Sequence, residues 1–196
     1  MSRGRPREFD RTEALNKAML VFWRKGYTAT SMNDLYEAMG IKSPSLYAAF
    51  GGKEDLYDEV LRHYEQCIAP LIWGDMADEP SPKRAVAKWL AHSAETLTRC
   101  DLPHGCMVTL SAVASEGNDR LGQRVQALRT GSLALLKERL AQAQALGELP
   151  ADTDIDALAG LYASLQQGMS IQARDGASRE TLLAIARMAM GLWPNP

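Results

Sequence analysis

The sequence predicts an all-α protein of about nine helices, with a helix-turn-helix unit near its start. Apolar side chains recur at intervals of three and four residues along most of the 196-residue chain, which is the spacing of one helical face. Serine, aspartate, glycine and proline stand between these stretches, where helices begin and end. No stretch alternates apolar and polar residues between turn signals, so no β-strand is expected.

The first helix is expected to begin at Asp10, which has the side chain of a helix cap, and to stop at Gly26. A short second helix follows. Either Thr30 or Ser31 caps it, and Asp34 completes a capping box if Ser31 is the cap.

Residues 30–50 read as two short helices joined by a tight turn. Ser43 is expected to cap the second of these, with Pro44 at its first position, where a missing N–H costs nothing. Leu46 and Phe50 then turn inward, and small and hydroxyl side chains are left outward. A short helix with such an outer face suits insertion into the major groove of DNA.

The remaining helices are placed by the same signals. One starts after Gly51 and Gly52 and ends before Pro70, and the next is capped by Ser81 with Pro82 at its first position. The helices after Pro70 are expected at about 82–99, 106–115, 118–146, 153–174 and 178–193.

The last helix is apolar most of the way round, so it must be covered on more than one side. One solution is a second copy of the chain, with the helices at 153–174 and 178–193 of each subunit forming a four-helix bundle. The alternative is that both faces are used inside one subunit. The homodimer is the prediction.

Charge is unevenly distributed along the chain. The formal net charge is −2, but residues through Lys53 contain nine Lys and Arg against five Asp and Glu, and the remainder contains thirteen against nineteen. A basic start on an acidic body is typical of a nucleic-acid-binding domain joined to another domain. Residues 1–9 form a basic arm with Arg3, Arg5 and Arg7, which is either a solvated terminus or an arm that reaches phosphates or the minor groove.

Several function classes are not expected. No apolar segment follows the first arginines, and the longest apolar run, 18–23, is too short for a membrane span. Cys67, Cys100 and Cys106 form no obvious disulfide framework, so a cytoplasmic location is expected. Cys100-x3-His104-x-Cys106 is not a standard zinc spacing, and enzyme motifs are missing. We therefore predict no metal, no cofactor and no enzyme.

Three motifs at fixed spacing carry a family resemblance. G-Y-x-x-T-S-M-x-D-L begins at Gly26, M-G-I at Met39, and L-Y-x-x-F-x-x-K-E-x-L-Y at Leu46. Together they resemble the TetR/AcrR family of bacterial transcriptional regulators over roughly residues 9–60. The resemblance implies a helix-turn-helix DNA-binding domain and a helical ligand-binding and dimerisation domain. The expected division is arm 1–9, DNA-binding domain 10–53 and ligand-binding and dimerisation domain 54–196.

The resemblance also implies roles for individual residues. The start of the second helix and Lys53 would touch phosphates, Tyr47 the DNA backbone, and the first turn of the recognition helix the base edges. With the arginine arm, the predicted DNA-binding residues are Arg3, Arg5, Arg7, Thr30, Ser31, Lys42, Ser43, Pro44, Ser45, Tyr47 and Lys53. Lys42 replaces the family's usual serine or threonine cap, and Ala49 its usual aromatic or histidine, so few side chains remain for reading bases.

The second domain is expected to bind a small-molecule effector that shifts the helix after Gly52. The candidate ligand-binding residues are large or polar groups on otherwise apolar helices, although core packing explains each of them as well: Trp89, His92, Met107, Tyr162 and Gln166.

Cys106 is a candidate redox-sensing residue. It is expected to open a helix, whose dipole would stabilise its thiolate. The stretch G-C-M-V-T-L-S-A also resembles a TetR subgroup in which a cysteine starts this helix and some members sense electrophiles or oxidants. The alternative is a buried cysteine that only packs.

These observations predict a homodimeric, ligand-responsive DNA-binding regulator, a repressor released from a palindromic operator by an unidentified small molecule. Two recognition helices about 34 Å apart would enter successive major grooves. One alternative is a regulator that senses electrophiles or oxidants through Cys106. The alternatives from other classes are a helical carrier or enzyme for a small molecule, and a helical interaction module that does not touch DNA.

Overall fold

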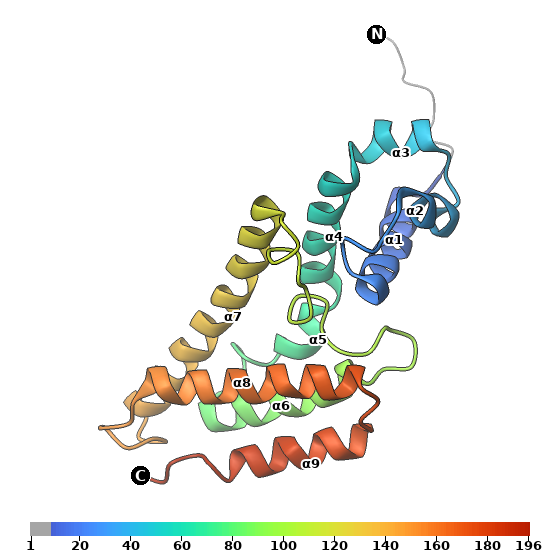
Figure 1. The fold of residues 1–196 in the computed structure, drawn as a ribbon. Helices are drawn as coiled ribbons and strands as arrows, with labels where there is room; N and C mark the ends of the chain where they lie inside the picture. The colour runs from blue at the N-terminus through green and yellow to red at the C-terminus, as the bar shows by residue number, and fades with distance from the viewer. Residues whose placement is uncertain (1–8) are drawn as a thin grey trace.

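The computed structural model describes residues 9–196, and Figure 1 shows their all-helical fold. No strand occurs among these residues, so the predicted fold class is confirmed. The described residues form nine α-helices: α1 (Arg11–Lys25), α2 (Met32–Met39), α3 (Ser43–Phe50), α4 (Lys53–Cys67), α5 (Ala69–Trp73), α6 (Pro82–Leu97), α7 (Asp119–Ala145), α8 (Ile155–Arg174) and α9 (Arg179–Met190).

The helices α1, α2 and α3 form a small N-terminal unit, the head. Asp10 caps α1 by accepting hydrogen bonds from the N–H groups of Thr12 and Glu13, at 2.8 and 3.0 Å. The predicted capping box starts α2, because the Ser31 N–H donates to Asp34 Oδ2 and the Asp34 N–H donates to Ser31 Oγ. The buried apolar residues of the head include Ala18, Met19, Phe22, Leu35, Met39, Leu46 and Phe50.

The start of α3 differs from the sequence prediction. Its N-cap is Lys42, whose side chain makes no capping hydrogen bond, and Ser43 is already helical. Ser43 Oγ instead accepts a hydrogen bond from the Tyr36 hydroxyl at 3.0 Å. The prediction that Ser43 caps α3 is therefore wrong. Pro44 still fits in the first turn, because the first N–H groups of a helix have no partner within it.

α4 joins the head to the rest of the protein and packs along α1 (Figure 1). The Tyr57 ring meets Phe22 edge-on at 5.0 Å between centroids, and Tyr64 meets Trp23 in the same way at 5.1 Å. Such aromatic pairs contribute about 0.5–1.5 kcal/mol beyond their area burial. α4 therefore belongs to the core of the head and to the core of the body.

The body contains α5 to α9. Its helices α6, α8 and α9 lie side by side, and α7 runs from them toward α4 (Figure 1). The Trp193 indole N–H donates to the Glu148 carbonyl at 2.8 Å, and its ring lies 6.2 Å from that of Tyr162, which holds the C-terminal segment against the core. Within residues 9–196, no helix is both long and apolar enough to cross a membrane.

The helix predicted at 106–115 is absent, and this segment consists of turns. Leu110 N–H bonds back to the Cys106 carbonyl, but the next N–H, on Ser111, bonds only three residues back, so no helical ladder develops. The segment is tied to α8 instead, since the Cys106 N–H donates to Ser170 Oγ at 2.8 Å. Gly105 (φ +81°) precedes it, and a Cβ there would lie 2.8 Å from the Ser170 carbonyl oxygen.

Candidate functional site

The outer face of α3 is open to solvent and carries few large side chains. Lys42, Pro44 and Tyr47 are exposed, and Ser43 and Ser45 are half-buried. Tyr47 is 52% exposed, and its pKa is raised by a hydrogen bond with Tyr36 and by repulsion between the two phenolates. Tyr47 therefore presents a neutral hydroxyl that can donate to an oxygen of an approaching phosphate.

Two predicted phosphate contacts lie at the start of α2, and they differ in exposure. Ser31 is exposed. Thr30 is only 1% exposed, and its hydroxyl donates to the Gly26 carbonyl at 2.6 Å while its N–H donates to the Tyr27 carbonyl. The polar groups of Thr30 are therefore used within the head.

Lys53 begins α4 beside the head. Its Nζ lies 4.4 Å from the centre of the Tyr27 ring and donates to the Thr28 carbonyl at 3.4 Å. Burial lowers the pKa of Lys53, and the nearby Glu116 carboxylate opposes this by raising it. The long side chain rests on the aromatic ring and is available to a phosphate at the surface.

Three basic residues of the N-terminal sequence form ion pairs within the fold, one of them with an acid outside that stretch. Arg11 pairs with Glu59, Lys17 with Glu13, and Lys25 with Asp34. Lys42 and Lys53 make no ion pair with any residue in 9–196. The predicted contacts Arg3, Arg5 and Arg7 lie outside the described residues.

A cavity of about 910 Å³ opens in the body between α4, α5, α6, α7 and α8, with the turns after Gly105 forming part of its wall. Volumes of this size are typical of sites for small molecules. Its wall is mainly apolar and includes Ile72, Trp73, Trp89, Val108, Leu128, Leu133, Leu135 and Leu136. The wall also carries polar side chains, namely Tyr64, Glu65, Thr109, Arg124, Gln126, Arg129, Thr130, Ser132, Gln166 and Gln167.

Two of the five predicted ligand-binding residues, Trp89 and Gln166, line this cavity. The Gln166 amide donates to Ser93 Oγ at 3.4 Å, whereas the Trp89 indole nitrogen is buried and has no hydrogen-bond partner among the described residues. Met107 and Tyr162 are buried outside the lining. His92 also lies outside it, with Nε2 4.0 Å from Asp75.

Cys106 lines the cavity but does not begin a helix, so the predicted stabilisation of its thiolate by a helix dipole does not apply. Its Sγ accepts a hydrogen bond from the Tyr64 hydroxyl at 3.3 Å. Burial and the neighbouring sulfur raise the pKa of Tyr64 well above its usual value, so this hydroxyl remains a donor. In the part of the chain described by the structure, no three His, Cys, Asp or Glu side chains are gathered as metal ligands.

Comparison with known proteins agrees with this geometry. The family described as "Bacterial regulatory proteins, tetR family" matches residues 14–60, and "Tetracyclin repressor-like, C-terminal domain" matches residues 82–188. The chain is also 40% identical over 196 residues to the HTH-type transcriptional repressor ComR of Escherichia coli (strain K12), covering 99% of this chain and 93% of that protein. The chain belongs to the TetR family.

Other members are also similar to this TetR-family chain. The HTH-type transcriptional repressor BdcR of Escherichia coli (strain K12) is 31% identical, over 95% of this chain and 90% of that protein. A cysteine mutant of the TetR family regulator CifR, solved in complex with 26-bp double-strand operator DNA, is 41% identical with a TM-score of 0.91. That similarity covers 97% of this chain and 100% of the CifR chain.

Sequence reasoning missed most of the cavity wall of this TetR-family protein. Glu65 and Arg124 occupy helix positions beside buried apolar residues, so each reads as a solvated charge at the edge of an amphipathic face. The position of Arg124 could have indicated a partly inward side chain, because it directly precedes the buried Val125 and follows the buried Leu121 by three residues. α5 was also missed, because five residues are too few to show helical periodicity.

Proposed function

We propose that this chain is a homodimeric transcriptional repressor that binds a palindromic operator through α3 of each subunit and releases it when a small molecule enters the cavity. The observation that carries the proposal is the similarity, over nearly the whole chain, to a regulator solved on its operator. Membership of a regulator family favours this function over a carrier or an enzyme. Such a repressor works in the cytoplasm, where the bacterial chromosome lies.

The DNA contacts that we propose come from the exposed edge of the head. Lys42, Ser43, Pro44 and Ser45, in the first turn of α3, face the base edges. Ser31, Tyr47 and Lys53 contact the sugar-phosphate backbone, and the arginine arm adds further contacts. Thr30 supports this surface from below, because its hydroxyl bonds to Gly26.

The proposed dimer interface lies on α8 and α9. Leu161 and Ile171 on α8, Met188 on α9 and Leu192 just after it expose between 42% and 77% of their surface. Large apolar side chains in such numbers on two adjacent helices favour contact with another protein surface. A second copy would bury them as a four-helix bundle and would fix the distance between the two α3 helices.

Salt dependence tests the DNA-binding function. A duplex selected from a random pool by the wild-type protein should bind with an affinity that falls steeply with salt, by about 0.9 logarithmic units per phosphate contact for each tenfold increase. Lys53→Ala should weaken binding and reduce the slope by about 1 for each phosphate that the lysine no longer neutralises. Lys17→Ala, which removes an equal charge that already pairs with Glu13, should leave both unchanged.

A chain that selects no duplex would refute the repressor. If Tyr47→Ala combined with Lys53→Ala changed nothing, the helical interaction module without DNA contact would be the better description. Fluorescence anisotropy with the labelled duplex measures all of these affinities.

The second candidate is a repressor that senses electrophiles through Cys106, and the favouring observation is that Cys106 lies in the cavity wall. The thiolate would add to an activated double bond such as that of N-ethylmaleimide, forming a C–S bond while a proton adds to the neighbouring carbon. In a Cys67→Ser, Cys100→Ser background, which removes the two exposed thiols, the maleimide should release the duplex. Further substitution of Cys106→Ser should abolish that release, and unchanged release would exclude the idea.

A further inference from the structure

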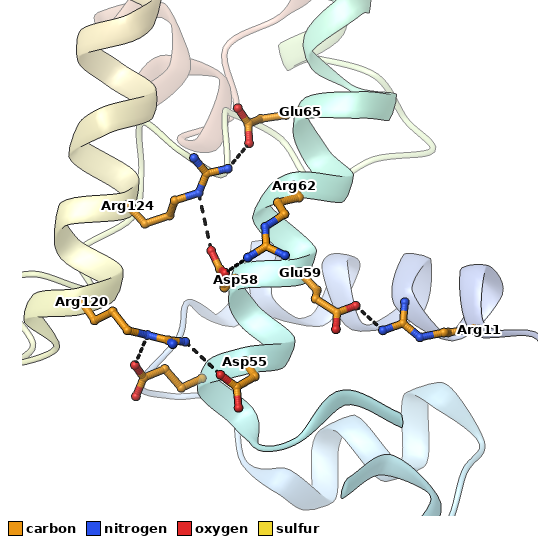
Figure 2. A network of polar contacts seen from close by, with 9 residues as sticks. Arg11, Asp55, Asp58, Glu59, Arg62, Glu65, Arg120 and Arg124 are labelled. Atoms are coloured by element: carbon orange, nitrogen blue, oxygen red, sulfur yellow. Dashed lines mark hydrogen bonds and ion pairs between the residues drawn. The ribbon is translucent and has the colours of Figure 1, made fainter. Parts of the chain in front are cut away.

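Two arginines of α7 connect that helix to acidic residues along α4 (Figure 2). Arg120 reaches Glu54 at 2.5 Å and Asp55 at 3.1 Å. One turn further along α7, Arg124 reaches Asp58, with Nε 3.5 Å from Oδ1, and donates from Nη2 to Glu65. These pairs hold α4, and therefore the head, against the body.

Arg124 differs from Arg120 because it also lines the cavity, as does its partner Glu65. Its Nε is buried and has no hydrogen bond of good geometry among the described residues. The side chain of Arg124 therefore contributes both to the contact between α4 and α7 and to the wall of the proposed effector site.

The cavity wall contains a buried donor and two guanidinium groups that a ligand could use. The Trp89 indole N–H is buried and lacks a partner among the described residues. Arg124 Nε has only the 3.5 Å contact with Asp58, which is too long for a good hydrogen bond. Arg129 adds a second cation to the lining, whereas Glu65 is the acid there and is already bound by Arg124. An acceptor atom on a ligand suits the Trp89 donor, and a negative charge suits the two guanidinium groups.

We propose that the cavity binds an apolar molecule carrying an anionic group of the carboxylate or sulfonate class, and that this group draws Arg124 away from Asp58 and Glu65. The inference rests on the proposed function and names the ligand class and the residue that transmits its binding. Arg124 is a positioning residue for the head as well as a ligand contact.

Withdrawal of Arg124 would loosen α4 at a point where little else holds it. α4 packs extensively on α1 but meets α7 sparingly, so the ion pairs make up a large part of that contact. The described arrangement resembles a relative bound to operator DNA, with a TM-score of 0.91. Loosening these pairs therefore moves the head away from the geometry that fits DNA, and operator affinity falls.

The ligand class is tested with two dyes that share one skeleton. 8-Anilinonaphthalene-1-sulfonate carries a sulfonate, and N-phenyl-1-naphthylamine does not. Fluorescence titration of the wild-type protein should show that the anionic dye binds about 10-fold more tightly, the lower end of what a charge-assisted hydrogen bond contributes. Arg124→Gln should reduce this preference to about 2-fold or less.

Arg62→Gln is the matched control. Arg62 also pairs with Asp58, but both residues belong to α4, and Arg62 does not line the cavity. This variant should keep the preference for the anionic dye. Equal binding of the two dyes to the wild type, or a preference that survives Arg124→Gln, would overturn the proposed ligand class.

Transmission is tested with the selected duplex. The anionic dye should weaken duplex binding by the wild type and by Arg62→Gln at least about 5-fold, which is the lower range of allosteric coupling. Arg124→Gln should bind the duplex more weakly without dye and show no further loss with it. Asp58→Asn, which removes a partner on α4, should weaken duplex binding while retaining the dye preference.

The outcomes separate this inference from the proposed function. A wild type that binds the duplex but responds equally to dye before and after Arg124→Gln would refute transmission through Arg124 and leave the repressor intact. A wild type that binds no duplex would refute the repressor and the release step together. The comparison of the two dyes would still decide the ligand class.

Discussion

His63 illustrates how one buried side chain makes the junction between head and body sensitive to acid. It lies on α4 and faces α1, with Nε2 2.5 Å from Asn16 Oδ1. Burial lowers the pKa of His63 below its ordinary value of 6.5. The folded protein therefore binds this proton less readily than the unfolded chain does.

We expect His63 to lower stability as the medium becomes acidic. Because the folded pKa is lowered, its contribution to the free energy of unfolding is complete above about pH 6.5 and is lost as pH falls through the folded pKa. The fall in Tm between pH 7.5 and 5.5 should be larger for the wild type than for His63→Gln. His92→Gln, at a half-exposed histidine of the body, should behave as the wild type. Equal falls in all three proteins would contradict this account.

Among the helices, the end of α1 is linked to the end of α8 by hydrogen bonds that include the loop at His104 and Gly105. The buried Trp23 indole N–H donates to the Gly105 carbonyl at 3.1 Å. Arg174, at the end of α8, donates to the carbonyls of His104 at 3.0 Å and Trp23 at 3.2 Å. Besides α4, this three-way contact therefore holds the head against the body.

Trp23→Phe removes the indole donor and leaves the Gly105 carbonyl unpaired. We expect a loss of about 1–3 kcal/mol, or roughly 2–10 °C in Tm, measured by circular dichroism. Trp193→Phe removes a comparable bond, to Glu148, at the opposite end of the body. Both variants should be less stable, but only Trp23→Phe should also weaken duplex binding, because only that bond reaches the head. Equal effects on DNA binding would argue against a role for this contact.

The elements also show which parts of the fold local sequence determines. Ser31 with Asp34, Asn118 and Ser178 cap their helices with bonds that span three residues, so the sequence predicts those helix starts. The segment 106–115 is different, because its decisive partner, Ser170, lies 64 residues away on α8. No local sequence pattern indicates a hydrogen bond between residues so far apart in the chain. The sequence therefore predicted a helix where the protein has turns.

At the scale of the whole molecule, the apolar faces of α8 and α9 should set the oligomeric state. Light scattering at about 10 μM should give the wild type twice its chain mass of 21.5 kDa, as expected for the commonest closed symmetry. Ile171→Asp with Met188→Asp should give the single-chain mass and weaken duplex binding at least about 10-fold, because one head loses its partner. Leu146→Asp changes a similarly exposed leucine outside both helices and should remain dimeric. A dimeric double variant would place the interface elsewhere.

The cavity could be predicted only in part, because its wall is formed by residues that lie far apart in the sequence. Trp89 and Gln166 stand out as polar or bulky groups on apolar stripes, and both line it. Glu65 and Arg124 could not be paired from sequence, since they are 59 residues apart and meet only when α7 crosses α4. The DNA-binding head was easier, because its motif occupies one continuous stretch with fixed spacing.

Tyr64 carries a consequence for anyone who wishes to build a biosensor from this protein. Its ring packs on Trp23 of α1, and its hydroxyl reaches Cys106 in the cavity wall. A library that varies Tyr64 to accept a new analyte would disturb DNA binding together with ligand binding. Most of its members would then bind DNA constantly or not at all, whatever the ligand. Diversity placed at Leu128, Leu133 and Gln167, which line the cavity from α7 and α8, alters what is detected while sparing the aromatic contact with the head.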